Sequence, residues 1–251
     1  MVIKMRIDIV TLFPEMCGAV MDMSITGRAR KRGYLQVCFH QLRDYAHDRH
    51  QRVDDVPFGG GKGMLLKPEP IGECFDALKE HLGVKPHIIY MSPKGRVLNQ
   101  QIVKDLSKYN NIAILCGHYE GVDERVLEEY VDEEISCGDY VLTGGEMPAI
   151  ILADAVSRMI SGVLSEDECF TEESHFSGLL EYPQYTRPAV WREKPVPDTL
   201  ISGDHKKVFQ WRRRESLKRT AVFRPDMLAQ AELTSDDKKF LAEINSTTCI
   251  K

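Results

Sequence analysis

Hydrophobic and polar positions follow two alternating patterns through the first 160 residues. Short apolar runs rich in β-branched residues predict strands over 6–13, 34–42, 87–92, 111–117 and 133–137. Amphipathic stretches with helical spacing predict helices over 69–83, 99–110 and 122–131. This alternation of strand and helix predicts an α/β fold with a mostly parallel sheet.

A further helix is predicted to begin within 143–146 and to continue through the apolar stripe 149–160. Thr143 and Glu146 have the spacing of a capping box, and Pro148 suits a first helical turn. Asp154 and Arg158 stand four residues apart on one face, with the acid first. We expect Asp154 to steady Arg158, which can then present its guanidinium to another group.

The pattern changes after residue 162. The segment 165–174 contains five acidic residues and no basic one, which predicts a mobile linker. Proline-punctuated extended segments follow, then two or three helices, of which the first carries the basic run 211–219 and the last is capped by Ser235 with Asp236. We therefore expect a catalytic domain over 1–162, an acidic linker over 163–175 and a helical domain over 176–251.

Composition restricts the class of protein. The chain has 251 residues, 43% of them hydrophobic and 28% charged, with a net charge of -5, so it can bury a sizeable core. Its seven cysteines form no Cys-x-x-Cys pair, which argues against a disulfide framework or a zinc site. No apolar stretch approaches membrane-spanning length, and no signal-peptide pattern is present, so we expect a soluble cytoplasmic protein.

Two basic clusters, 28–32 and 211–219, stand out from the acidic whole. Each is typical either of a phosphate-contacting surface or of a solvated helix face, because nucleic-acid binding depends on local rather than total charge.

The glycine-rich stretch PFGGGKGM at 57–64 is not a phosphate-binding P-loop. That motif needs a glycine at the position of Val56 and a serine or threonine at the position of Gly63. The glycines therefore indicate either a tight turn or a close approach of backbone to a flat ligand.

Three further glycine-bearing loops, 92–95, 117–124 and 137–146, follow predicted strand ends, where open α/β sheets bind ligands. The last two contain acids and no lysine or arginine: Glu120, Asp123, Glu124, Asp139 and Glu146. A pyrophosphate cofactor such as NAD or ATP fits such loops poorly, whereas S-adenosylmethionine, with its cationic sulfonium, fits them. The alternative is that these acids only cap helices.

Five motifs, at 11–16, 44–64, 116–126, 136–149 and 178–188, together resemble the bacterial tRNA (guanine-N1)-methyltransferase family of the knotted SPOUT class. The resemblance covers essentially the whole chain, in order and with matching spacing. It implies methyl transfer from S-adenosylmethionine to N1 of guanosine 37, next to the tRNA anticodon. It also implies a deep trefoil knot in the parallel sheet, a small helical tRNA-binding domain at the C-terminus, and a homodimer with active sites between subunits.

Carried over by position, the family's cofactor pocket falls on three segments of this chain. The residues that the resemblance implies are Tyr90, Met91, Ser92, Gly117, Tyr119, Glu120, Gly121, Cys137, Gly138, Tyr140, Leu142, Gly144, Gly145 and Pro148.

The loop matching 58–64 lies beside the target guanine in the family, so its glycines, among them Gly59 and Gly63, would let backbone approach a base flipped out of its stack. Asp54 is interpreted as a partner of that base, or else as a stabiliser of the turn. The basic run, with Arg212, Arg213 and Arg214, is expected to contact phosphates of the tRNA anticodon stem-loop.

Guanine N1 carries a proton at neutral pH, so methylation there needs a general base. The family uses a linker aspartate, and alignment places Glu173 at that position; His175 is the alternative base.

Arg158 matches the arginine that stabilises negative charge on guanine O6, with Asp154 holding it. Glu120 is expected near the sulfonium or near a magnesium ion that the family is reported to use, although no metal-ligand cluster in the sequence supports that ion independently.

Two other functions remain open from the sequence. A non-catalytic RNA-binding protein would keep the cofactor pocket but lose the base through the change to Glu173. A knotted methyltransferase acting on a ribose 2′-oxygen would need no guanine-specific loop.

Overall fold

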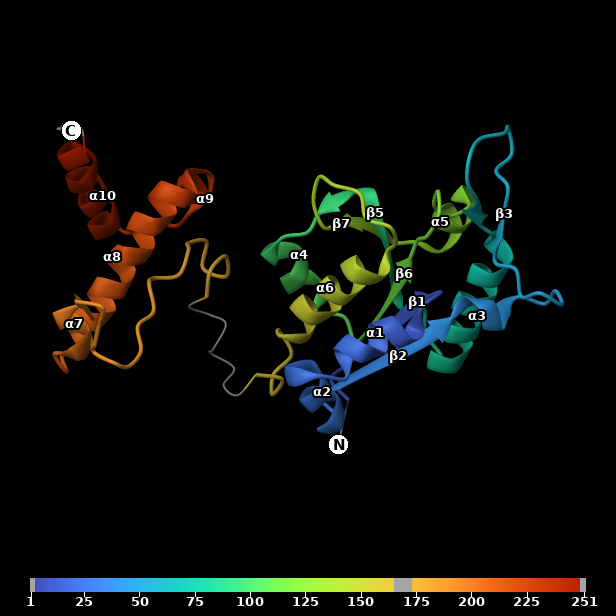
Figure 1. Cartoon of the computed structure of the whole chain (residues 1–251), viewed down its shortest axis with the longest axis horizontal. Helices are drawn as coiled ribbons and strands as arrows, with labels where there is room; N and C mark the ends of the chain where they lie inside the picture. Colours follow the sequence, from blue (N-terminus) through green and yellow to red (C-terminus); the bar gives the residue numbers. More distant parts are fainter. Residues whose placement is uncertain (1–2, 165–172, 249–251) are drawn as a thin grey trace. The chain divides into compact units, whose positions relative to one another are not determined.

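The computed structural model describes residues 3–164 and 173–248. Its chain divides into two compact units, Met1–Asp167 and Glu168–Lys251 (Figure 1). That division lies inside the predicted linker 163–175, most of which is outside the described residues. The prediction that this segment is mobile therefore stays a prediction.

The first unit is built on a five-stranded sheet in the order β2-β1-β6-β5-β7. All of its strand pairs are parallel, which confirms the predicted α/β fold with a parallel sheet. The strands are β1 (Met5–Thr11), β2 (Leu35–Gln41), β5 (His87–Val97), β6 (Asn111–Cys116) and β7 (Glu133–Ser136). Strand order does not specify how the chain is threaded, so the trefoil knot stays a prediction.

Helices cover both faces of this sheet, because its strands bury side chains on both sides. One buried cluster joins β1 to four helices, α1 (Pro14–Met21), α2 (Ser24–Lys31), α4 (Gln100–Leu106) and α6 (Glu146–Ser157). The other joins β1 and β6 to α3 (Pro68–Leu82), α5 (Glu124–Tyr130) and the 3₁₀ turn η1 (Leu42–Tyr45). A two-stranded hairpin, β3 (Asp54–Asp55) and β4 (Leu65–Leu66), carries the glycine-rich stretch.

Two local predictions for the first unit are wrong. The stretch 92–95 is not a loop after a strand: it lies inside β5, where the register shifts between Met91 and Arg96. The proposed capping box at Thr143 does not form either, because α6 begins at Glu146 with Gly145 as its N-cap and no side-chain cap.

The second unit contains a short hairpin and four described helices. These elements are β8 (Val190–Trp191), β9 (Lys194–Pro195), α7 (Asp198–Ile201), α8 (His205–Phe223), α9 (Pro225–Gln230) and α10 (Ser235–Thr248). The basic run lies on α8, which α7 precedes, so it is not on the first helix. Thr234 rather than Ser235 caps α10: its Oγ1 accepts the N–H of Asp237, and Asp237 Oδ2 accepts the N–H of Thr234.

A buried ion-pair cluster lies on β1 and β2. The Asp8 carboxylate is fully buried and accepts hydrogen bonds from Arg6 Nε and Nη2, both at 2.8 Å, while His40 Nε2 lies 2.7 Å from its Oδ1. Burial alone would raise the pKa of Asp8, but the hydrogen bonds from His40 and Arg6 outweigh it and lower that pKa below its usual 3.8. The ionised carboxylate is therefore the form that the fold stabilises.

We expect Asp8→Asn to lower the free energy of unfolding by about 1.5–3 kcal/mol at neutral pH, because a charge-assisted pair is lost inside the sheet. A carboxyl whose pKa is lowered by folding contributes stability above its unfolded pKa and loses it as the pH falls through the folded value. The difference between wild type and variant, measured by urea denaturation, should therefore shrink below pH 3.8. The exposed Glu128, replaced by glutamine, serves as the control, and a pH-independent difference would contradict this account.

Candidate active site

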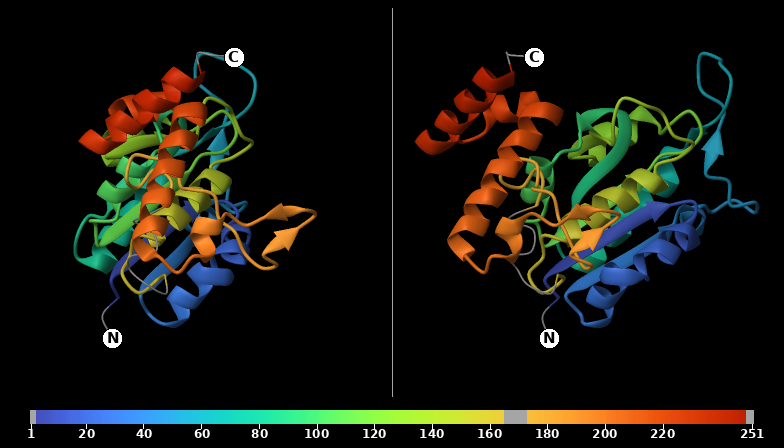
Figure 2. Two further views of the ribbon diagram at one scale, coloured as in Figure 1. Left: turned by 90° about the vertical axis from the view of Figure 1, so that its left-hand side faces the viewer. Right: turned by 60° about the vertical axis from the view of Figure 1, so that its left-hand side comes forward.

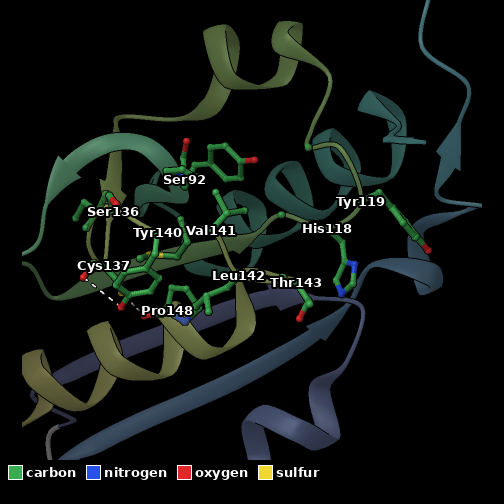
Figure 3. Close-up of a pocket in the computed structure, with 18 of the residues that line it drawn as sticks. Ser92, His118, Tyr119, Ser136, Cys137, Tyr140, Val141, Leu142, Thr143 and Pro148 are labelled. Atoms are coloured by element: carbon green, nitrogen blue, oxygen red, sulfur yellow. Dashed lines mark hydrogen bonds between the residues drawn. The ribbon is translucent and has the colours of Figure 1, made fainter. Parts of the chain in front are cut away.

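A pocket of about 250 Å³ opens beside the register shift in β5, where β6 and β7 end and α6 begins. Every residue expected to bind the cofactor lines it, except Gly138. Figure 3 shows Ser92, the 136–143 loop and Pro148 around one cavity, with His118 and Tyr119 at its far side. The lining also includes residues that were not expected individually. Of these, Pro93, His118, Val141 and Thr143 lie in the three predicted glycine-bearing loops, and Ile135 and Ser136 lie on β7.

Glycines let the segments around the pocket approach one another. A Cβ on Gly117 would stand 2.7 Å from the hydroxyl oxygen of Tyr90, and one on Gly145 would stand 2.7 Å from both Cys116 Cα and Gly117 N. Gly138 has φ +151° and faces Tyr140, whose Oη lies 3.5 Å from the carbonyl oxygen of Cys137. Gly138 therefore shapes the wall without lining it.

The electrostatics of the pocket suit a ligand that is neutral or cationic. Among its lining residues within the described chain, Glu120 is acidic and none is lysine or arginine. Burial, with the charges of Glu134 and Glu124, raises the pKa of Tyr90 to about 12, so its hydroxyl stays uncharged even well above neutral pH. Asp123, by contrast, caps α5 by accepting the N–H of Arg125, as the alternative interpretation of the acids expected.

The Glu146 side chain has contacts that the sequence pattern did not predict. Its carboxylate is buried, accepts a hydrogen bond from Thr11 Oγ1 at 2.8 Å, and lies 3.9 Å from His118 Nε2. It thereby connects the ends of β1 and β6 beneath Gly144, where a Cβ would stand 2.4 Å from its Oε2. No signal along the sequence links Thr11 to Glu146, because they are 135 residues apart.

The glycine-rich stretch lies directly beside the pocket. The Leu66 N–H donates to the carbonyl of Gly121 at 2.9 Å, and the Glu120 N–H donates to the carbonyl of Met64 at 3.0 Å. Gly63, with φ +85°, approaches the side chain of Glu120 so closely that a Cβ would stand 2.4 Å from Oε1. Gly63 therefore needs to be glycine for both conformation and space.

The tip of this stretch is open. Gly59 and Gly60 have φ near +85°, with no atom within 4 Å of a built Cβ, and Phe58 is fully exposed. Asp54 is half-buried at the base, paired across the hairpin with Leu66. Both interpretations of the tip, a tight turn and a surface that accepts a flat ligand, fit this geometry.

Asp154 and Arg158 do not form the expected ion pair within the described residues. The helix α6 ends at Ser157, Arg158 is its C-cap, and the Arg158 N–H donates to the carbonyl of Asp154 at 3.2 Å. The connection between the two residues is therefore through the backbone, and Asp154 is exposed. A positioning role for the Asp154 side chain is not supported by this geometry.

Glu173 and His175 lie at the start of the second unit, in a turn closed by the Phe176 N–H and the Glu173 carbonyl at 3.3 Å. His175 is exposed, has φ +73°, and donates its N–H to the carbonyl of Leu179 at 3.0 Å. Glu173 is half-buried. Each side chain belongs to a unit other than the one with the pocket, and their roles stay predictions.

The three arginines of the basic run differ in their surroundings. Arg213 donates from Nε and Nη2 to both carboxylate oxygens of Asp237, at 3.2 and 2.8 Å, which favours a structural role. The guanidinium of Arg212 stacks 4.7 Å from the Tyr182 ring centroid, and that of Arg214 lies 5.0 Å from the Phe240 centroid. Arg214 is exposed and best suited to contact phosphate.

The part of the chain that the structure describes contains no cluster of side chains typical of a metal site. No group of three or more histidine, cysteine, aspartate or glutamate side chains there could hold a metal ion. The described residues also include no helix that is long and apolar enough to cross a membrane.

Comparison with known proteins agrees with this geometry. The family model "tRNA (Guanine-1)-methyltransferase TrmD" matches residues 5–230. A tRNA (guanine-N(1)-)-methyltransferase of Ruminiclostridium cellulolyticum is 53% identical over 89% of this chain and 96% of its own, and one of Alkaliphilus oremlandii is 50% identical over 96% and 99%.

A crystal structure gives the same result for the fold. The tRNA (m1G37) methyltransferase of Aquifex aeolicus superposes with a TM-score of 0.73 at 42% identity, covering 90% of this chain and 95% of that one. With the family model matching most of the chain, the protein belongs to the TrmD family of tRNA (guanine-N1)-methyltransferases.

Proposed function

We propose that this enzyme transfers a methyl group from S-adenosylmethionine to N1 of guanosine 37 in tRNA. The observation that carries the proposal is the contact between two loops: the glycine-rich stretch meets the pocket at Gly63 and Glu120. A pocket whose described lining includes no lysine or arginine suits a cationic methyl donor, and an open glycine loop beside it suits a flat base.

The residues around the pocket fit S-adenosylmethionine, which would supply an electrophilic methyl group. Backbone groups of the 117–121 and 137–145 segments would bind it, and Tyr90 would pack against Gly117 while uncharged. Glu120 would favour the positive sulfonium by charge. We propose that these loops are part of the family's trefoil knot.

Side chains of the protein would remove the proton from guanine N1 and stabilise the charge on guanine O6. A general base must hold the proton that leaves guanine N1, and we assign this role to Glu173. A planar cationic donor at guanine O6 would stabilise the charge that develops there, and we assign this role to Arg158. No magnesium site is assigned, because the described residues contain no group of three or more histidine, cysteine, aspartate or glutamate side chains that could hold one.

A homodimer is supported by the position of Arg158. Pro148 lines the pocket at the first turn of α6, and Arg158 lies ten residues further on, about 15 Å along a helix that rises about 1.5 Å per residue. Within one chain Arg158 is therefore remote from the pocket, and Arg158 of a second copy would have to complete the site.

The surface around α1 is apolar. Phe13, Met16, Val20 and Met23 of α1 and its flanks form an exposed stripe with 43% to 65% of each side chain accessible. Met147 and Ile151 extend it on α6, against which α1 packs. We propose that this stripe is buried in the dimer.

We expect methyl transfer from labelled S-adenosylmethionine to an unmodified tRNA transcript with guanosines at positions 36 and 37. The product nucleoside should be N1-methylguanosine, and a transcript with adenosine at 37 should remain unlabelled. A 2′-O-methyl nucleoside would instead support a ribose methyltransferase. Cofactor and tRNA binding without any methyl product would support a non-catalytic RNA-binding protein.

A further inference from the structure

The segment 184–195 is continuously exposed, although it contains two large aromatic side chains. Tyr185 is 49% accessible and Trp191 is 57% accessible. Together with Val190, which is 58% accessible, they make this short segment a candidate contact surface. The left view of Figure 2 shows β8 and β9 extending away from the helices of their own unit.

The backbone holds Trp191 in a defined hairpin rather than in a free loop. Trp191 pairs with Lys194 across the two strands, and the Val196 N–H donates to the carbonyl of Ala189 at 2.8 Å. Arg192 and Glu193, the two residues of the turn, have φ of +48° and +62°. Positive φ at both central residues is the conformation of a tight hairpin turn, and it is unfavourable for side chains other than glycine, asparagine and aspartate.

A short two-stranded hairpin without a buried face gains little stability from packing. This hairpin nevertheless adopts an unfavourable turn and exposes its largest side chain. Such a combination favours a role in binding over a role in folding.

The charge and the aromatic ring of the hairpin suit contact with RNA. Arg187, Arg192 and Lys194 are basic and Glu193 is acidic, so the exposed segment is positive in a chain whose net charge is -5. The Arg192 guanidinium lies 4.7 Å from the centroid of the Trp191 ring. An aromatic ring beside cationic groups is the arrangement that binds single-stranded nucleic acid, through base stacking and phosphate attraction.

We propose that the hairpin 189–196 is an RNA-contact element, in which Trp191 stacks on an unpaired base of the tRNA while Arg192 and Lys194 approach its phosphates. The proposal rests on the RNA substrate proposed above. It assigns to the hairpin a contribution to substrate affinity that is separate from the chemical step.

Trp191→Ala should raise the Kd for unmodified tRNA about tenfold, since base stacking on an aromatic side chain is worth roughly that much. Trp191→Phe should restore most of the affinity. The methyl-transfer rate at saturating tRNA and the affinity for S-adenosylmethionine should stay unchanged. Phe223→Ala removes an equally exposed aromatic ring, 68% accessible, from the end of α8 and should leave the tRNA Kd unchanged.

Fluorescence gives a direct readout of the stacking. The chain has two tryptophans, so Trp211→Phe leaves Trp191 as the reporter and Trp191→Phe leaves Trp211. Addition of tRNA should strongly quench the fluorescence of Trp211→Phe, which keeps Trp191. It should only weakly quench that of Trp191→Phe, which keeps Trp211. This binding measurement needs no turnover, so it separates a failure of the hairpin proposal from a failure of the proposed methyl transfer.

Two results would overturn the proposal. One is an unchanged tRNA Kd in Trp191→Ala together with no quenching of Trp191. The other is a change in oligomeric state of Trp191→Ala in sedimentation, with tRNA binding per dimer unaffected, which would show that the hairpin contacts a second copy of the chain instead.

Discussion

Glu173→Gln is expected to lower the rate of methyl transfer to tRNA by about two to four orders of magnitude, the usual contribution of a general base. The amide has nearly the same shape as the carboxylate but cannot accept the proton from guanine N1. Single-turnover methyl transfer with labelled cofactor measures this rate. Binding of S-adenosylmethionine by calorimetry should stay at the wild-type level, because the pocket belongs to the other unit.

His175→Ala is the matched control, two residues away in the same turn. Its side chain is exposed, and its backbone N–H, which donates to the Leu179 carbonyl, is kept by alanine. We expect this variant to retain nearly full activity. Loss of activity in His175→Ala with activity kept in Glu173→Gln would assign the base to the histidine.

Glu173→Asp tests the length of the side chain. The resemblance implies an aspartate at the base position, so Glu173 would place its carboxylate one methylene further from the backbone. A displacement on the scale of 1 Å can change a rate by about a hundredfold. If the surrounding turn compensates for the glutamate, the shorter aspartate should be slower than wild type but faster than the glutamine variant.

The five sheet strands were predictable from the sequence because hydrophobic periodicity depends on neighbouring residues alone. The observed strands β1, β2, β6 and β7 differ from the predicted ranges only at their ends. The pocket lining followed from resemblance, since its segments match family motifs by position. The helices α1 and α2 were missed, because their apolar positions are interrupted and neither has a side-chain cap.

Errors arose where a tertiary contact outweighed a local pattern. Thr143 and Glu146 have capping-box spacing, but the Glu146 carboxylate accepts a hydrogen bond from Thr11, at the end of β1. Asp154 and Arg158 have the spacing of a helical ion pair, but the helix ends between them. The close approach of Gly63 to Glu120 has no local signature, because only the folded chain brings the two loops together.

Gly145→Ala is expected to reduce both S-adenosylmethionine binding and turnover about a hundredfold, by displacing the first turn of α6 from the 117–121 loop. The backbone of Gly145, with φ -81°, accepts alanine without strain, so the effect isolates the added methyl group. That methyl would stand 2.7 Å from Cys116 Cα and from Gly117 N. Both are backbone atoms at the end of a buried strand, so they cannot rotate away as a side chain would.

The displacement should also break the hydrogen bond from the Gly145 N–H to the carbonyl of Gly117, now 2.8 Å long, which joins the two walls of the pocket. Calorimetric titration with S-adenosylmethionine measures the loss, and circular dichroism reports whether the sheet remains folded. Gly18→Ala is the control, because its added Cβ would meet atoms only at 3.6 Å or beyond, inside α1 of the same unit. Wild-type affinity in folded Gly145→Ala would mean that the loop and the helix can separate without opening the site, and that the narrow spacing at this glycine does not hold the cofactor.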